Sequence, residues 1–165
     1  MYIFKFNIKP AIEFDPTGEL GLNFLTIGLA HKETNEQIDI VRTVLENKEE
    51  LDWFEKNEEA IRNEKCPTKA ERTSSVAERM HEAYEALDVD SWTEEKLDGM
   101  LGELYEFRSH HELWFAFPGQ DLPNIFFAAN DNGHEISCHD DDLTFAYNVD
   151  ISSLFDEAKR VKKFV

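Results

Sequence analysis

Hydrophobic and polar positions alternate near the start of the chain, which is the pattern of a β-strand with one buried face. Phe4, Phe6 and Ile8 alternate with polar side chains up to Pro10, where the first predicted strand ends. Residues 22–30 are mostly apolar and predict a second strand. Residues 38–45 fit a strand and the entry of a helix equally well, and the pattern does not decide between them.

The middle of the chain, residues 46–108, has the spacing of amphipathic helices instead. We expect a first helix over residues 46–63, followed by a break at Cys66-Pro67, because a residue before proline disfavours the helical conformation. A second helix is predicted over residues 74–87, where the apolar side chains recur every three or four residues.

A third helix is predicted to begin at Ser91, which would serve as its N-cap. Its apolar positions continue to Phe107 at helical spacing. Gly99 and Gly102 lie inside this pattern, where each costs about 1 kcal/mol relative to alanine. A close helix packing would explain them.

The C-terminal third returns to strand patterns and ends in a helix. The apolar run 113–117 predicts a strand, and residues 144–149 predict another by their alternation. Asp150 then stands where the N-cap of a final helix is expected.

Between these two strands the pair Asn132-Gly133 predicts a β-hairpin, because both residues accept the positive φ angles of a tight turn. With this turn, Phe127 lies opposite Cys138 on a face that reads as core. Phe126 lies opposite His139 on the other face, which we expect to be partly open to water.

Strands, then helices, then strands predict an α+β fold rather than a strict alternation of strands and helices. We expect a single domain over residues 1–165, with strands in about 1–45, helices in about 46–108, and strands with the final helix in 110–165. In this prediction the N- and C-terminal strands form a mainly antiparallel sheet, and the helices cover one face.

The chain is strongly acidic, with 35 Asp and Glu against 17 Lys and Arg and a formal net charge of −18. Between Arg108 and Lys159 there are ten acids and no Lys or Arg. Such a surface attracts cations over roughly 8–10 Å. We therefore expect a cationic protein as partner, and neither nucleic acid nor a membrane, since both reward Lys and Arg.

The residues that could hold a metal ion are not spaced as such sites require. His134, Cys138 and His139 offer zinc ligands, but the predicted hairpin turns Cys138 and His139 to opposite faces. Asp140-Asp141-Asp142 lacks the order of a calcium loop. No phosphate-binding loop or nucleophile elbow occurs. We expect no cofactor, no metal and no catalytic residue, with an enzyme whose site is not readable from sequence as an alternative.

Two cysteines are too few for a disulfide framework, which favours reduced thiols and a cytoplasmic location. No apolar run approaches the ~20 residues that span a bilayer. Cys138 lies on the predicted core face. Cys66 lies in the most basic stretch of the chain, which makes it the more reactive thiol.

A partner-binding surface is predicted around the end of the second hairpin strand. The three consecutive acids form either a solvated turn or a loop that contacts the partner. Phe126 is either covered by a helix or an exposed anchor with an acidic rim. The predicted contact residues are Phe126, Glu135, His139, Asp140, Asp141 and Asp142, and the acidic run 82–106 is a second candidate surface.

The opening Phe4-Lys5-Phe6-Asn7-Ile8-Lys9-Pro10, with Leu22-Asn23-Phe24-Leu25-Thr26 after it, is similar to the start of an uncharacterised bacterial family. In size, unpaired cysteines, missing catalytic motif and clustered acids, the chain resembles the small acidic immunity proteins that bacteria pair with secreted toxins. The resemblance implies a non-enzymatic protein that blocks a cationic toxin domain, such as a nuclease. A general interaction module or a mimic of nucleic-acid charge is the alternative.

Overall fold

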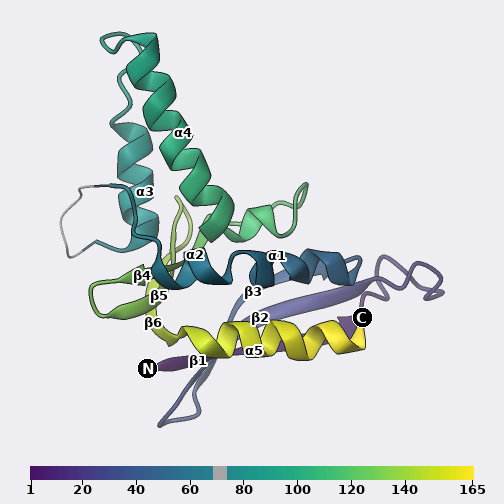
Figure 1. Ribbon diagram of the computed structural model, residues 1–165. Coiled ribbons are helices and arrows are strands. Elements are labelled where there is room, and N and C mark those ends of the chain that lie inside the picture. Colours follow the sequence, from purple (N-terminus) through teal and green to yellow (C-terminus); the bar gives the residue numbers. More distant parts are fainter. Residues whose placement is uncertain (69–73) are drawn as a thin grey trace.

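A six-stranded sheet organises the computed structural model, which describes residues 1–68 and 74–165 (Figure 1). Its neighbours are antiparallel except at the centre, where the first and last strands run parallel. In spatial order the strands are β3 (Gln37–Leu45), β2 (Asn23–His31), β1 (Tyr2–Pro10), β6 (Thr144–Asp150), β5 (Gly133–His139) and β4 (Ile125–Asn130). The α+β fold with a sheet of N- and C-terminal strands is therefore confirmed.

The described residues also form five α-helices and three 3-10 helices. The α-helices are α1 (Asp52–Lys56), α2 (Glu58–Asn63), α3 (Val76–Glu85), α4 (Glu94–His111) and α5 (Ile151–Val161). The 3-10 helices are η1 (Lys48–Leu51), η2 (Leu113–Phe115) and η3 (Lys162–Phe164). Among the described residues, no helix is both long enough and apolar enough to cross a membrane.

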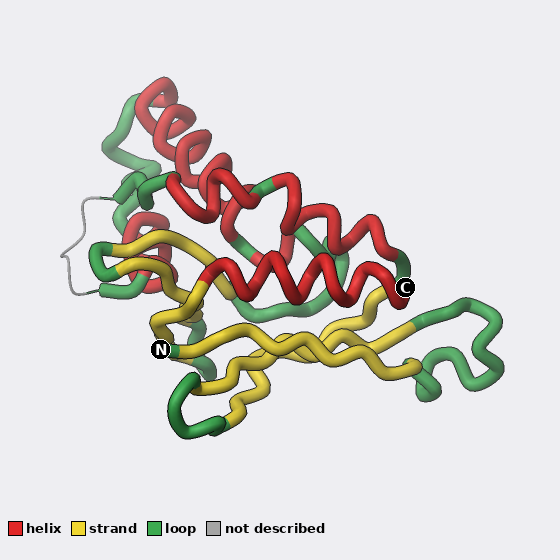
Figure 2. The backbone as a smooth tube through the Cα atoms, turned by 60° about the horizontal axis from the view of Figure 1, so that its bottom comes forward, coloured by secondary structure: helices red, strands yellow, loops and turns green. Residues whose placement is uncertain are grey.

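The main core lies between the sheet and the helices α1, α2 and α5 (Figure 2). Alternate residues of β1, Phe4 and Phe6, point into it and are buried, as the alternation predicts. From α5, Leu154 and Phe155 pack against them. The N-cap of α5 is Asp150, whose carboxylate accepts from the amide of Ser152, as expected.

The two halves of the sheet meet over only two residue pairs, Tyr2 with Val149 and Ile3 with Asp150. Beyond them, β1 needs other partners for its backbone groups, since buried amides without a hydrogen bond are costly. Side chains of α5 supply these partners: Ser153 Oγ accepts from the amide of Phe4 at 2.9 Å, and Glu157 accepts from that of Phe6 at 2.7 Å. Helix α5 therefore bridges the gap between the two halves.

A second, smaller core lies on the opposite face of the β4–β5 hairpin. There α3 and α4 rise from the sheet as the arm of residues 76–111 (Figure 1). The buried members of this core are Val76, Ala77, Met80, Leu104, Phe107, Phe126 and Ala128. The prediction that this hairpin face is partly wet was wrong, because the base of the arm covers it.

The hairpin register also differs from the predicted one by two residues. Asn130 pairs with Gly133, so the turn consists of Asp131 and Asn132 rather than Asn132-Gly133. Phe127 lies opposite Ile136, not opposite Cys138. A shift of two keeps every side chain on its predicted face, because side chains alternate with a period of two.

Three smaller differences concern local structure. Residues 38–45, ambiguous by pattern, belong to β3. Residues 113–117 were predicted as a strand but begin with the 3-10 helix η2, and the buried Leu113, Ala116 and Phe117 have helical spacing. Helix α4 begins two residues later than predicted, since Thr93, not Ser91, accepts from the amide of Lys96 as N-cap.

Candidate functional site

The acidic residues Asp140, Asp141 and Asp142 form the tight turn between β5 and β6. Its backbone is closed by a hydrogen bond from the amide of Asp140 to the carbonyl of Leu143, at 2.9 Å. The carboxylate of Asp140 accepts from both the backbone and the side-chain amide of Asn124, and so ties the turn to the preceding loop. Asp141 and Asp142 are exposed. Asp140 therefore has a structural role, and the two acids after it are available to a partner.

The turn borders an open depression of about 730 Å³ that also contains two histidines. His139, at the end of β5, and His81, on α3, place their ring centroids 4.8 Å apart. Asn124 and Leu143 also line the depression. His81 was missed by the sequence analysis, since no spacing relates it to β5 and only the packing of α3 brings it there.

Phe126 does not reach this surface. Its side chain is 3% exposed and packs in the second core beneath α3 and α4. Of the two interpretations of Phe126, the structure supports coverage by a helix. The expectation of an exposed anchor at this position is corrected, because the ring packs in one core with Ala77 and Met80 of α3 and is almost wholly buried.

Glu135 is likewise buried, at 6% exposure, and lies at the other end of β5. One carboxylate oxygen accepts from the amide of Val76 at 2.7 Å, and the other from the side chain of Asn130 at 2.8 Å. Next to it, Ser137 Oγ accepts from the amide of Ala77 at 3.1 Å. These groups satisfy amides of the first turn of α3. Glu135 therefore docks the arm on the hairpin, with both of its carboxylate oxygens bonded within the protein.

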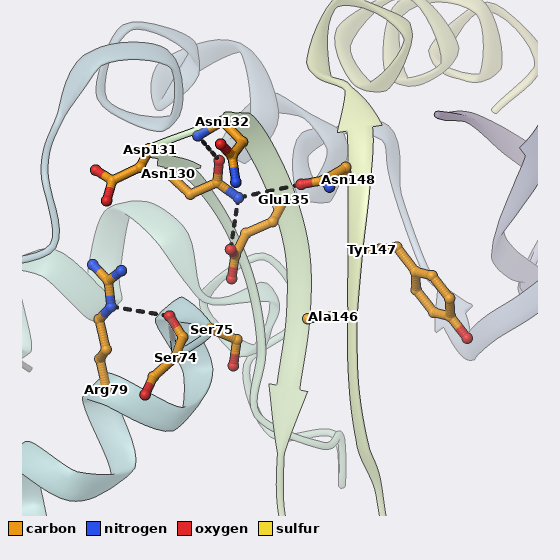
Figure 3. A pocket seen from close by; sticks show the side chains of 10 residues that line it. All are labelled: Ser74, Ser75, Arg79, Asn130, Asp131, Asn132, Glu135, Ala146, Tyr147 and Asn148. Carbon is orange, nitrogen blue, oxygen red and sulfur yellow. Dashed lines mark hydrogen bonds between the residues drawn. The ribbon is translucent and has the colours of Figure 1, made fainter. Parts of the chain in front are cut away.

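Glu135 lines a separate polar pocket of about 180 Å³ between α3 and the hairpin turn (Figure 3). Several of its polar groups are engaged within the protein. The amide of Asn130 bonds to Glu135 and Asn148, and Arg79 donates to the carbonyl of Ser74. This pocket is a network that joins β4, β5, β6 and α3.

Two histidines at the end of α4 form a third cluster of polar side chains, after the acidic turn and the polar pocket. Glu64 Oε2 lies 3.0 Å from His110 Nδ1 and 3.1 Å from His111 Nε2, and His111 Nδ1 lies 2.8 Å from the carbonyl of Phe127. His111 is fully buried and stacks on Phe107. Burial lowers the pKa of His111, against the opposing effect of its hydrogen bonds. The cluster joins the end of α2 to α4 and β4.

Neither the histidines nor the cysteines of the described residues assemble a metal site. No group of three or more His, Cys, Asp or Glu in residues 1–68 and 74–165 has the arrangement to hold an ion. Burial, with Asp140 nearby, raises the pKa of the Cys138 thiol to about 12, so this thiol stays protonated. Cys66 is partly exposed, and its sulfur lies 3.3 Å from Thr68 Oγ1.

The acids of the arm lie apart from the ion pairs of the protein. The ion pairs of Lys and Arg in the described residues lie at the sheet and at α1, α2 and α5, except for Arg108 with Glu112 at the base of α4. The nine acids of residues 82–106 are exposed, and none takes part in an ion pair with the described cations. The same holds for Asp141 and Asp142. The arm and this turn thus carry uncompensated negative charge.

Comparison with known proteins adds no relative: no family model, curated protein or solved structure matches the chain.

Proposed function

We propose that the protein is a non-enzymatic, cytoplasmic inhibitor that binds a cationic protein, namely a toxin domain such as a nuclease, and covers its active site. The observation that carries the proposal is the segregation of charge. Exposed acids without a cationic partner among the described residues are gathered on the arm and on the turn of Asp141 and Asp142. The like charges of such a surface repel one another, and this repulsion is reduced when a basic surface covers them.

The expected contribution of these acids is mainly to the rate of association. Complementary charges steer diffusional encounter and can raise association rate constants toward roughly 10⁸–10⁹ M⁻¹s⁻¹ at low salt. In this proposal His139, Asp141 and Asp142 make the contacts around the depression, while Asp140 holds their turn in place. The acids of residues 82–106 extend the attracting surface along the arm.

The test uses the product of the open reading frame next to this gene as the candidate partner. Association with the purified protein is measured by surface plasmon resonance over a range of salt concentrations. We expect D141N/D142N to slow association and to flatten its dependence on salt. Asp140 is left unchanged, because its bonds to Asn124 hold the turn.

The matched control is E33Q/E36Q, which removes the same charge from the exposed β2–β3 turn. This control is expected to change the association rate much less. An association rate indifferent to salt and equal in both double variants would overturn the proposal. Equal binding to several unrelated basic proteins would instead favour a general interaction module.

A further inference from the structure

An aromatic hollow lies beside the acidic depression, between the C-terminal half of α4 and residues 113–124. It has a volume of about 430 Å³. The rings of Tyr105, Phe115 and Trp114 follow one another along it, with centroids 5.6 Å apart between Tyr105 and Phe115 and 5.2 Å apart between Phe115 and Trp114. Tyr105 is 60% exposed and Trp114 is 38% exposed. Single exposed apolar side chains are ordinary, whereas contiguous aromatic side chains at a hollow are a feature that protein-binding surfaces share.

This hollow and the acidic depression adjoin each other, and together with the small cavity between them they are called the furrow below. Asn124 lines both of them and also the small cavity above Phe126 that lies between. Arg108 is shared by the hollow and that cavity. The three hollows therefore adjoin one another between the turn of Asp141 and Asp142 and Trp114.

The residues that line the furrow carry more negative than positive charge. Its lining includes five carboxylates, those of Glu112, Asp121, Asp140, Asp141 and Asp142, and one guanidinium, that of Arg108. This guanidinium is already neutralised, because it binds both carboxylate oxygens of the buried Glu112. The hydrogen bonds to Glu112 raise the pKa of Arg108, which keeps the guanidinium charged. Of the remaining acids, Asp121 lies at the aromatic hollow and Asp141 and Asp142 lie at the depression, and all three are exposed.

We infer that the furrow receives a basic segment of a protein in which an apolar side chain stands among Lys and Arg residues. The apolar side chain would pack against Trp114 and Tyr105, and the basic ones would meet Asp121 and Asp141. This arrangement matches the anatomy of protein interfaces, in which aromatic anchors lie inside a charged rim. The inference rests on the proposed function and replaces Phe126 by Trp114 and Tyr105 as the anchor.

The experiment compares two probes of equal charge by calorimetry: a helical peptide of Leu and Lys, and oligolysine. We expect the Leu/Lys peptide to bind more tightly than oligolysine. W114A and Y105A should each weaken binding of the Leu/Lys peptide by at least about tenfold and leave oligolysine binding unchanged. F164A, which removes an exposed ring that lines a different hollow beside β1 and α5, is the matched control. Circular dichroism checks that each variant is folded. Because Tyr105 is exposed, Y105A is the substitution that should disturb folding least.

Three outcomes separate this inference from the proposed function. Loss of the Leu/Lys preference in W114A and Y105A, but not in F164A, supports the furrow as the anchor site. Equal binding of both probes, weakened only by salt, overturns the inference and leaves the proposed electrostatic function standing. Failure of both probes to bind at low salt overturns both.

Discussion

Gly99 and Gly102 lie in the middle of α4, and nothing in the structure requires glycine at either position. Neither has a positive φ angle, and a Cβ atom added at either would meet no heavy atom within 4 Å. The close packing that could explain them is therefore not present among the residues that the structure describes. Each glycine weakens the helix, because it exposes backbone to water and loses more conformational freedom on folding than alanine.

Replacing both glycines by alanine should raise the free energy of unfolding. Each substitution contributes about 0.8–1.0 kcal/mol in an exposed helix interior. An added Cβ atom at either position meets no heavy atom within 4 Å, so the sum of the two propensity gains, roughly 2 kcal/mol, is expected for G99A/G102A. For a chain of this size, 1 kcal/mol shifts Tm by about 2–4 °C, so the expected increase is roughly 4–8 °C.

The measurement is urea denaturation followed by circular dichroism, together with thermal unfolding of the single and double variants. The control is G28A, at the bulge between β2 and β3, where an added Cβ would lie 3.0 Å from the carbonyl oxygen of Ile38. That variant should be destabilised. A double variant with an unchanged midpoint would refute the reasoning, because it would show that the outer half of α4 opens independently of the core.

Three further predictions concern buried groups. Burial lowers the pKa of the His111 imidazole below its ordinary 6.5, so on acidification this imidazole is protonated in the unfolded chain before it is protonated in the folded protein. The free energy of unfolding therefore has its full value above pH 6.5 and decreases as the pH falls below it. H111Q should flatten this decrease in urea midpoints between about pH 7.5 and 5, and an unchanged slope would contradict the assignment. A thiol reagent should label Cys66 faster than Cys138 in the native protein; the reverse order would mean that the β5 thiol is accessible. F126A should lower the free energy of unfolding by about 3–5 kcal/mol, and a variant of wild-type stability would show that the ring is not in a core.

For the acidic turn, some properties could be predicted from the sequence and others could not. Its position after a strand and its charge are local properties, and both were predicted correctly from the chain alone. Which of its acids is free depends on the loop that packs beside it, since Asp140 is occupied by Asn124, sixteen residues earlier in the chain. The aromatic hollow was not predicted, because residues 113–117 are too short a run to separate a strand from a 3-10 helix by pattern.

The sequence by itself determined the elements whose periodicity is local, such as β1 with its buried Phe4 and Phe6, and the cap of α5 at Asp150. It also determined the faces of the β4–β5 hairpin, because the alternation of side chains survives a register shift of two. The register itself, the burial of Phe126 beneath the arm and the meeting of His81 with His139 were decided only by the tertiary structure. Each of these depends on which distant segment covers a face, and the energy of that packing is not encoded in the spacing of residues within either segment.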